Sequence, residues 1–221
     1  MKKWSDDNPK AALMERKRAA IVAAARQAFL ENGYAEASMD RIAESAAVSV
    51  KTIYRHFENK DELFSAVMQA ACRADSSIPA ERDDDASPAA RFNWFEEGPR
   101  RGLAAAGRDY LRHLLSEEQL ALYRVVTRDA HRFPGLGRRY EKEVVAARTN
   151  IMSQYLTRWA PVENWRIKNP DGASSVFAAL LRAGVFEEVL HGLRIPEERT
   201  IAQQARSAAE LFSKLLQLGA L

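Results

Sequence analysis

Five polar side chains between residues 51 and 56 have the types and the spacing of a surface that could bind nucleic acid: Lys51, Thr52, Tyr54, Arg55 and His56. Lys and Arg can donate to guanine or phosphate, Thr can contact a thymine methyl group or a phosphate, and Tyr and His can donate to phosphates. We expect base or near-base contacts from Lys51 and Arg55, mixed contacts from Thr52, and phosphate contacts from Tyr54 and His56.

Two short helices must position these side chains. Ser49 is a suitable N-cap for the second helix, whose apolar residues recur at three- and four-residue steps at Val50, Ile53 and Phe57. A first amphipathic helix is predicted from about Met39 to Ala46, with Ser38 as its N-cap. The pattern therefore predicts a helix-turn-helix whose second helix enters the major groove of DNA. The alternative is a small helical hairpin whose polar face is merely solvated.

The segment around these helices resembles the N-terminal domain of the TetR family of bacterial repressors. The match runs through Ala24 to Tyr34, Ser38 to Ala43, Val48-Ser49, Thr52 to Phe57 and Lys60 to Phe64. It departs at Ala47, where the family usually has Gly, and a non-Gly residue in the left-handed conformation costs ~1 to 2 kcal/mol. The resemblance implies double-stranded operator DNA as the partner, and Lys60 resembles a phosphate contact used across the family. The predicted DNA-binding residues are Ser38, Met39, Ser49, Lys51, Thr52, Tyr54, Arg55, His56 and Lys60.

The sequence predicts an all-α fold with two domains. Residues 1–74 are expected to form a three-helix helix-turn-helix domain with a linking fourth helix, and residues 89–221 a larger α-helical domain for effector binding and dimerisation. A polar connector is predicted at 75–88 because apolar residues are nearly absent there. Its acidic run, Asp83 to Asp85, is not expected to hold a metal, since consecutive loop residues seldom converge on one ion.

The positive charge gathers near the N-terminus, where residues 1–60 hold 11 Lys and Arg against 8 Asp and Glu, whereas residues 61–221 hold 22 of each. No apolar run approaches the ~20 residues of a membrane span. The single cysteine, Cys72, cannot form an intramolecular disulfide. There is no glycine-rich phosphate loop, Cys/His metal spacing or nucleophile motif. We therefore expect a cytoplasmic protein that is not an enzyme and uses no cofactor.

Helical periodicity continues along the chain. A first long helix is predicted from near Lys10 to Glu31, ended by Asn32-Gly33, and Asn59 is expected to cap the fourth helix. In the second domain, Ser116 to Gln119 has the form of a capping box. The helices predicted there cover about 99–115, 117–133, 136–159, 171–192 and 196–218, with a loop at 161–170.

The resemblance also implies an effector site between the central helices of the second domain. Its candidate residues are aromatic or polar: Trp94, Phe95, Tyr110, His113, Tyr123, Phe133, Tyr155, Trp159 and Phe177. Such a lining would suit a small apolar or aromatic effector that releases a repressor from its operator. For each residue singly, an ordinary place in the core is the alternative.

The last two long helices carry apolar stripes that predict a homodimer with a two-fold, four-helix interface. The stripe residues are Val176, Ala179, Leu180, Ala183, Phe186, Leu190, Ile201, Ala205, Ala208, Leu211, Phe212 and Leu215. Alternatively, both stripes pack only inside the subunit. A second function also remains open, in which a DNA-binding protein of this fold uses its C-terminal domain to bind a protein partner rather than a small molecule.

Overall fold

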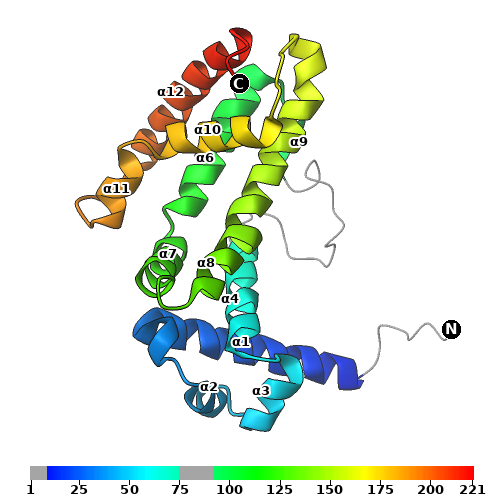
Figure 1. Ribbon diagram of the computed structural model, residues 1–221, viewed down its shortest axis with the longest axis vertical. Coiled ribbons are helices and arrows are strands. Elements are labelled where there is room, and N and C mark those ends of the chain that lie inside the picture. Colours follow the sequence, from blue (N-terminus) through cyan, green and yellow to red (C-terminus); the bar gives the residue numbers. More distant parts are fainter. Residues whose placement is uncertain (1–8, 75–91) are drawn as a thin grey trace, which may run out of the picture. The chain divides into compact units, whose positions relative to one another are not determined.

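The computed structural model describes residues 9–74 and 92–221, which form helices joined by short turns (Figure 1). The all-α prediction is confirmed. The chain divides into two compact units, one containing residues 1–74 and 121–144 and the other containing residues 75–120 and 145–221. The units are therefore not contiguous in sequence, and residues 121–144, which lie inside the predicted domain 89–221, belong to the unit that contains residues 1–74. The predicted connector at 75–88, its aspartates and the side chain of Cys72 lie outside what the structure describes.

The first unit is built mainly from the N-terminal helices α1 (Pro9–Glu36), α2 (Met39–Ser45), α3 (Val50–His56) and α4 (Lys60–Ala74). A later stretch of the chain adds most of α7 (Glu117–Asp129), α8 (Pro134–Tyr140) and the π-helical turn η2 (Glu141–Val145). The predicted end of the first helix at Asn32-Gly33 is a bend instead. Gly33 has φ 79° and ψ 178° there, and helical structure resumes as far as Glu36.

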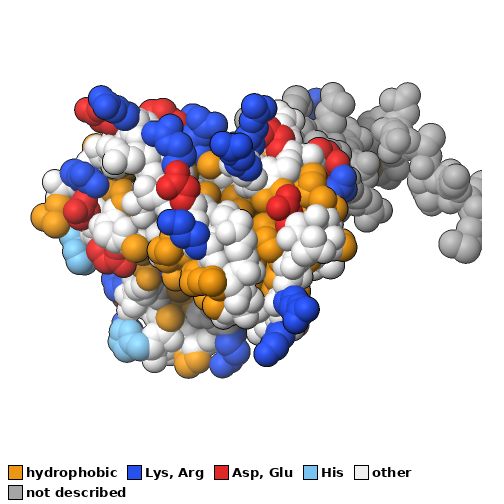
Figure 2. Space-filling model, turned by 90° about the horizontal axis from the view of Figure 1, so that it is seen from above, with side chains coloured by type: hydrophobic (Ala, Val, Ile, Leu, Met, Phe, Trp, Pro, Cys, Tyr) orange, Lys and Arg blue, Asp and Glu red, His pale blue; other side chains and the backbone are white. Residues whose placement is uncertain are grey.

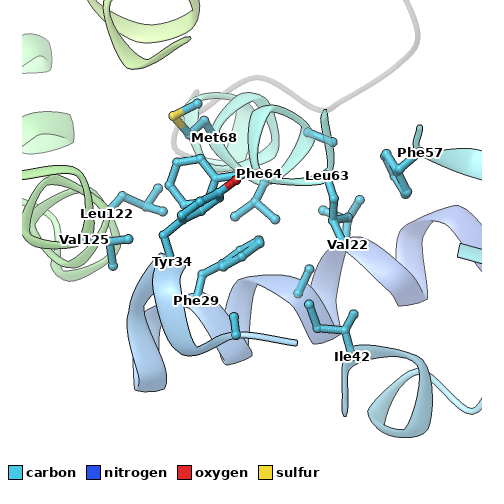
Figure 3. Packing of buried hydrophobic residues seen from close by; sticks show 14 of the residues in the cluster. Val22, Phe29, Tyr34, Ile42, Phe57, Leu63, Phe64, Met68, Leu122 and Val125 are labelled. Atoms are coloured by element: carbon cyan, nitrogen blue, oxygen red, sulfur yellow. The ribbon is translucent and has the colours of Figure 1, made fainter. Parts of the chain in front are cut away.

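The core of this unit explains why residues 121–144 belong to it (Figure 3). The ring centroid of Phe64 lies 4.9 Å from that of Phe29 and 5.5 Å from that of Tyr34, in edge-to-face contact. Leu122 and Val125 of α7 are buried in the same apolar cluster. Full burial of one such side chain contributes about 1.5–3 kcal/mol, so α7 is part of the folding unit that carries α2 and α3.

The second unit contains the short 3-10 helix η1 (Asn93–Glu96), α6 (Pro99–Leu114), α9 (Ala146–Glu163), α10 (Pro170–Arg182), α11 (Val185–Leu190) and α12 (Glu198–Gln217). α12 packs along α6, and α10 packs against both α9 and α12. The rings of Phe177 and Phe212 stack with centroids 4.7 Å apart, which joins α10 to α12. Among the described helices of the two units, none is both long and apolar enough to cross a membrane.

Several predicted helix boundaries after residue 115 are wrong. The helix expected at 117–133 ends at Asp129. The helix expected at 136–159 is interrupted by η2 and then runs through Pro161 to Glu163, because Pro161 lies in its last turn, where few helical hydrogen bonds remain to be lost. The helix expected at 171–192 is broken at Gly184, whose φ of 80° is incompatible with continuing an α-helix. The last helix begins at Glu198 rather than at 196.

Candidate nucleic-acid interface

The start of α3 is fixed by its cap. The Ser49 hydroxyl accepts a hydrogen bond from the backbone amide of Thr52 at 3.1 Å, and the two hydroxyl groups lie 2.8 Å apart. Ile53 and Phe57 are buried beneath the helix. The predicted helix and its N-cap are confirmed, and α3 is held by one apolar face so that its opposite face is free to meet a partner.

The turn before α3 contains a left-handed residue at the position where the resembled family usually has Gly. Ala47 has φ 52°, and the backbone amide of Val48 donates to the carbonyl oxygen of Ala43 at 3.0 Å. Ser38 caps α2 by accepting from the amide of Arg41 at 3.2 Å. The strained turn is thus retained by the packing of α2 against α3 around buried Ala43 and Ile53.

The outward side of α3 presents a continuous polar surface. Lys51, Tyr54 and Arg55 are exposed, and Thr52 is half-buried. Together with Ser49 they line a shallow concavity. Cationic, hydroxyl and phenolic donors therefore lie on one side of a helix short enough to enter a major groove.

His56 differs from its neighbours on α3 because it is half-buried. Its Nε2 atom is buried and has no hydrogen-bond partner among the described residues. Burial lowers the pKa of His56, and the guanidinium groups of Arg55 and Arg18 lower it further. The imidazole therefore favours its neutral form in the free protein, and any phosphate contact that it makes would be a neutral hydrogen bond unless binding adds a proton.

Lys60 at the start of α4 is engaged inside the protein. Its ammonium group donates to the carbonyl oxygens of Ala35 at 3.1 Å and Ala37 at 2.8 Å, and it lies 4.7 Å from the ring centroid of Tyr34. Burial lowers the pKa of Lys60. An ammonium has three donors, so one remains for the predicted phosphate contact. Lys60 also holds the α1–α2 connection, a role that the sequence did not suggest.

Two further predicted contacts, Ser38 and Met39, lie at the start of α2. Both are half-buried. The Ser38 hydroxyl is occupied as a cap, and Met39 packs against the apolar cluster of the first unit. Their structural roles are clear, whereas their contacts with DNA remain a prediction.

Asp129 at the end of α7 is a buried anchor that sequence reasoning missed. Its Oδ2 atom accepts from the backbone amides of Tyr34 at 2.8 Å and Ala35 at 3.3 Å. Burial alone would raise the pKa of Asp129, but hydrogen bonds from Arg128 and from these two amides hold it below its usual value. The Tyr34 hydroxyl in turn donates to Asp61. Asp129 and Tyr34 are 95 residues apart, so no local pattern could have paired them.

Seven of the nine predicted effector-site residues lie in the second unit. Six of them are aromatic, and the seventh is His113. Trp94, Phe95 and Tyr155 are buried, with the Tyr155 ring 5.5 Å from that of Trp94 and 5.9 Å from that of Phe95. Trp159 lies 6.3 Å from Tyr155. Phe177 stacks on Phe212, as described above. Tyr110 is half-buried, and the guanidinium carbon of Arg148 lies 5.9 Å from its ring centroid. His113 is half-buried in the same unit.

The other two predicted effector-site residues are in the first unit instead. The ring of Phe133 lies 5.2 Å from that of Tyr34, and the ring of Tyr123 lies 6.1 Å from that of Tyr140. Both residues belong to the stretch that joins the N-terminal helices. The structure therefore does not bring the nine candidates together within one unit.

The predicted dimer stripe divides into buried and exposed residues. Phe186, Ile201, Ala205, Ala208 and Phe212 are buried within the subunit, so for them the internal-packing alternative holds. They were assigned to the interface because an apolar stripe does not say which surface covers it. The remaining stripe residues are exposed or half-buried: Val176, Ala179, Leu180, Ala183, Leu190, Leu211 and Leu215. Seen from above, hydrophobic side chains gather in patches among the charged ones (Figure 2).

Two family descriptions match this chain. Residues 21–67 match "Bacterial regulatory proteins, tetR family", and residues 101–215 match "AefR-like transcriptional repressor, C-terminal domain". The first match covers α2, α3 and most of α1 and α4, and the second covers most of the remaining helices.

Individual proteins show the same likeness. The HTH-type transcriptional activator FasR of Mycolicibacterium smegmatis is 42% identical over 55 residues, which are 25% of this chain and 25% of FasR. The chain thus matches only about a quarter of the length of that curated relative. A solved structure of a TetR-family regulator from Mesorhizobium loti has a TM-score of 0.74 at 24% identity, covering 91% of this chain and 97% of that one. The flavonoid-responsive regulator FrrA has a TM-score of 0.72 at 26% identity, covering 90% and 96%.

Proposed function

The chain belongs to the TetR family of bacterial regulatory proteins and is a DNA-binding transcriptional regulator, and from this premise we propose that it is a repressor released from its operator by a small apolar or aromatic effector. The observation that carries the DNA-binding part of the proposal is the outward side of α3, where exposed Lys51, Tyr54 and Arg55 lie on a helix fixed from behind by Ile53 and Phe57. The regulator acts in the cytoplasm, where its DNA partner is.

The roles proposed for the individual residues follow from the chemistry of their side chains. Lys51 and Arg55 contact base edges, Thr52 makes mixed contacts, and Tyr54 and His56 contact phosphates. Lys60 contributes a phosphate contact with its remaining donor while it holds the carbonyl groups of the α1–α2 connection. Ser38, Met39 and Ser49 lie at the starts of α2 and α3 and complete the surface.

A pair of substitutions tests this division of roles. Lys51→Ala should weaken binding to the operator and relax sequence preference, because a base contact is lost. Lys60→Ala should weaken binding to all duplexes and lower the salt slope by ~1, and it should also lower stability through its lost carbonyl contacts. Affinities for operator and random duplexes across a salt series distinguish these patterns. Equal loss of specificity from both variants would contradict the assignment.

The effector proposal is supported by the aromatic group in the second unit. Trp94, Phe95, Tyr155 and Trp159 lie in successive ring contact, and the buried Nε1 atom of Trp159 has no hydrogen-bond partner among the described residues. A flavonoid-responsive protein of similar structure supports an aromatic ligand. Compounds of this class should raise the melting temperature and lower operator affinity together. A compound set in which the first effect never accompanies the second would refute effector release.

Dimerisation is proposed because a helix-turn-helix gains useful specificity from two half-sites about one helical turn, or a multiple of it, apart. The exposed or half-buried stripe residues of α10 and α12, among them Ala179, Leu180, Leu211 and Leu215, are suited to a two-fold contact. Sedimentation should show a dimer at micromolar concentration, and a monomer there would defeat this part of the proposal.

A protein partner is the second candidate function. Between α11 and α12 the side chains of Leu193 and Ile195 are 74% and 91% exposed, which is unusual for large apolar residues so close together. If Leu193→Ser combined with Ile195→Ser leaves the dimer and its effector response intact but abolishes regulation in cells, the protein-partner function is favoured over the sensor.

A further inference from the structure

The first three turns of α1 project from the first unit. Residues 9–20 precede the family match at 21–67, and every residue from 11 to 20 is exposed except Lys17, which is half-buried. The segment carries four Lys or Arg residues and a single acidic residue, Glu15. A helix end that buries so little protein gains little stability from its own core, so its positive charge suggests an external partner.

The projecting turns lie alongside α3 (Figure 1). The Nη2 atom of Arg55 donates to the Sδ atom of Met14 at 3.5 Å. The guanidinium carbon of Arg18 lies 5.0 Å from the ring centroid of Phe57, the residue that ends α3. The contact between Arg55 and Met14 therefore joins one side of the start of α1 to the surface of α3 that faces DNA in the proposed function, and Arg18 lies against Phe57 at the end of α3.

Helical spacing separates the cations of this segment into two sides. Lys17 and Arg18 are three and four residues after Met14, so all three side chains lie toward the side of α1 that contacts α3. Lys17 and Arg18 both influence the charge state of His56 on α3. Arg16 is two residues from both Met14 and Arg18, which places it on the opposite side of the helix.

We propose that the start of α1 is a second DNA-binding surface, in which Lys17 and Arg18 bind phosphates beside the major groove that α3 enters. The proposal rests on the proposed function of α3 and extends its contact area. Arg18 is exposed and Lys17 is half-buried, and both are cations that can contact phosphates. They therefore supply charge neutralisation and orientation, and the sequence preference stays with α3.

The size of the effect follows from counterion release. The logarithm of the binding constant falls linearly with the logarithm of the salt concentration, and each lost phosphate contact makes that fall less steep by about 0.9. At 0.15 M salt this corresponds to about a 5-fold loss of affinity. Removing both cations should therefore lower the slope by about 1.8, and affinity by about 30-fold, for each protomer bound. Operator and random duplexes should lose affinity by the same factor, so their ratio should not change.

The experiment compares the full-length variants Lys17→Ala, Arg18→Ala and the double variant with the control Arg16→Ala, which removes one positive charge, as each single variant does, from the other side of the same helix. Binding to operator and random duplexes is measured by anisotropy across a salt series. The control should retain the slope of the unsubstituted protein. The pair Lys17→Arg, Arg18→Lys should restore both slope and affinity, which a merely structural defect would not predict.

Two results would overturn the inference while leaving the proposed function intact. In the first, the double variant keeps the slope and affinity of the Arg16→Ala control. In the second, it loses preference for the operator, which would mean that the segment contacts bases or orients α3. Failure of the unsubstituted protein to prefer any operator would instead refute the function on which the inference rests.

Discussion

Asp129 should be among the most stabilising polar residues of the DNA-binding unit, although it lies far along the chain from α2 and α3. Its carboxylate accepts from the buried backbone amide of Tyr34 at 2.8 Å and from that of Ala35 at 3.3 Å. Asp129→Ala leaves both amides without this acceptor. A buried donor left unsatisfied costs about 1–3 kcal/mol, and the longer bond contributes less. We therefore expect a loss of about 2–4 kcal/mol in the free energy of unfolding.

The ion pair between Asp129 and Arg128 adds little to the expected loss in the free energy of unfolding. The two side chains are 3.2 Å apart, but that of Arg128 is 54% exposed, so solvent screens the attraction. Asp129→Asn keeps one neutral oxygen acceptor and should lose about half as much stability as Asp129→Ala, because hydrogen bonds to a charged acceptor are roughly twice as strong as neutral ones.

Urea unfolding followed by circular dichroism measures these changes, with the midpoint read at an unchanged m-value. Glu44→Ala removes an exposed carboxylate from the same unit and should change stability by less than about 0.5 kcal/mol. If Asp129→Ala costs no more than Glu44→Ala, the carboxylate does not anchor α1 and the reasoning is refuted.

The pH dependence gives a second check on Asp129. Because the pKa of Asp129 is lower in the folded protein than in the unfolded chain, its stabilising contribution is fully present above the unfolded value of about 3.9 and is lost as the pH falls through the folded value. The difference between the unsubstituted protein and Asp129→Ala should stay constant from pH 7 to about pH 5 and shrink in acid. A difference that grows below pH 4 would contradict this sign.

Three further substitutions have expected outcomes. Gly33→Ala should cost about 1–3 kcal/mol in urea unfolding, because φ is 79° there and a Cβ would occupy the place of the Arg128 guanidinium. Ala47→Gly should stabilise the protein by up to about 1 kcal/mol, because the strain removed from the left-handed residue exceeds the conformational entropy that glycine adds to the unfolded chain. A loss of stability would show that the turn is unstrained. A phosphate that binds His56 should raise the lowered pKa of its imidazole, so affinity for DNA should increase as the pH falls from 7.5 to 6. His56→Gln should abolish that increase. The control His131→Gln, at an exposed histidine, should keep it.

Much of the candidate site could be predicted because its determinants are local. The caps at Ser38, Ser49 and Asn59 each depend on a bond to an amide three residues later. The left-handed conformation at Ala47 is what the resemblance implies, since the family usually has Gly at that position of the turn. Such features need no knowledge of the rest of the fold, so the sequence and the resemblance were sufficient for them.

Long-range packing could not be predicted in the same way. An apolar stripe shows that one side of a helix is covered, but not by what, and Ile201 and Phe212 proved to be covered within the subunit. The anchoring carboxylate of Asp129 and the inward ammonium of Lys60 depend on backbone groups brought close by folding. Gly184 breaks a helix whose periodicity continues on both sides, because one glycine in a helical pattern does not by itself predict a stop.

The most direct test of the account is the binding of the purified protein to the DNA upstream of its own gene, measured by anisotropy across a salt series with a random duplex as the control. A sequence-specific regulator of this family should bind the upstream fragment a thousandfold or more tightly than the random duplex, with two protomers at each site. Equal, weak and strongly salt-dependent binding to both duplexes would contradict an operator there, because charge alone would account for the affinity.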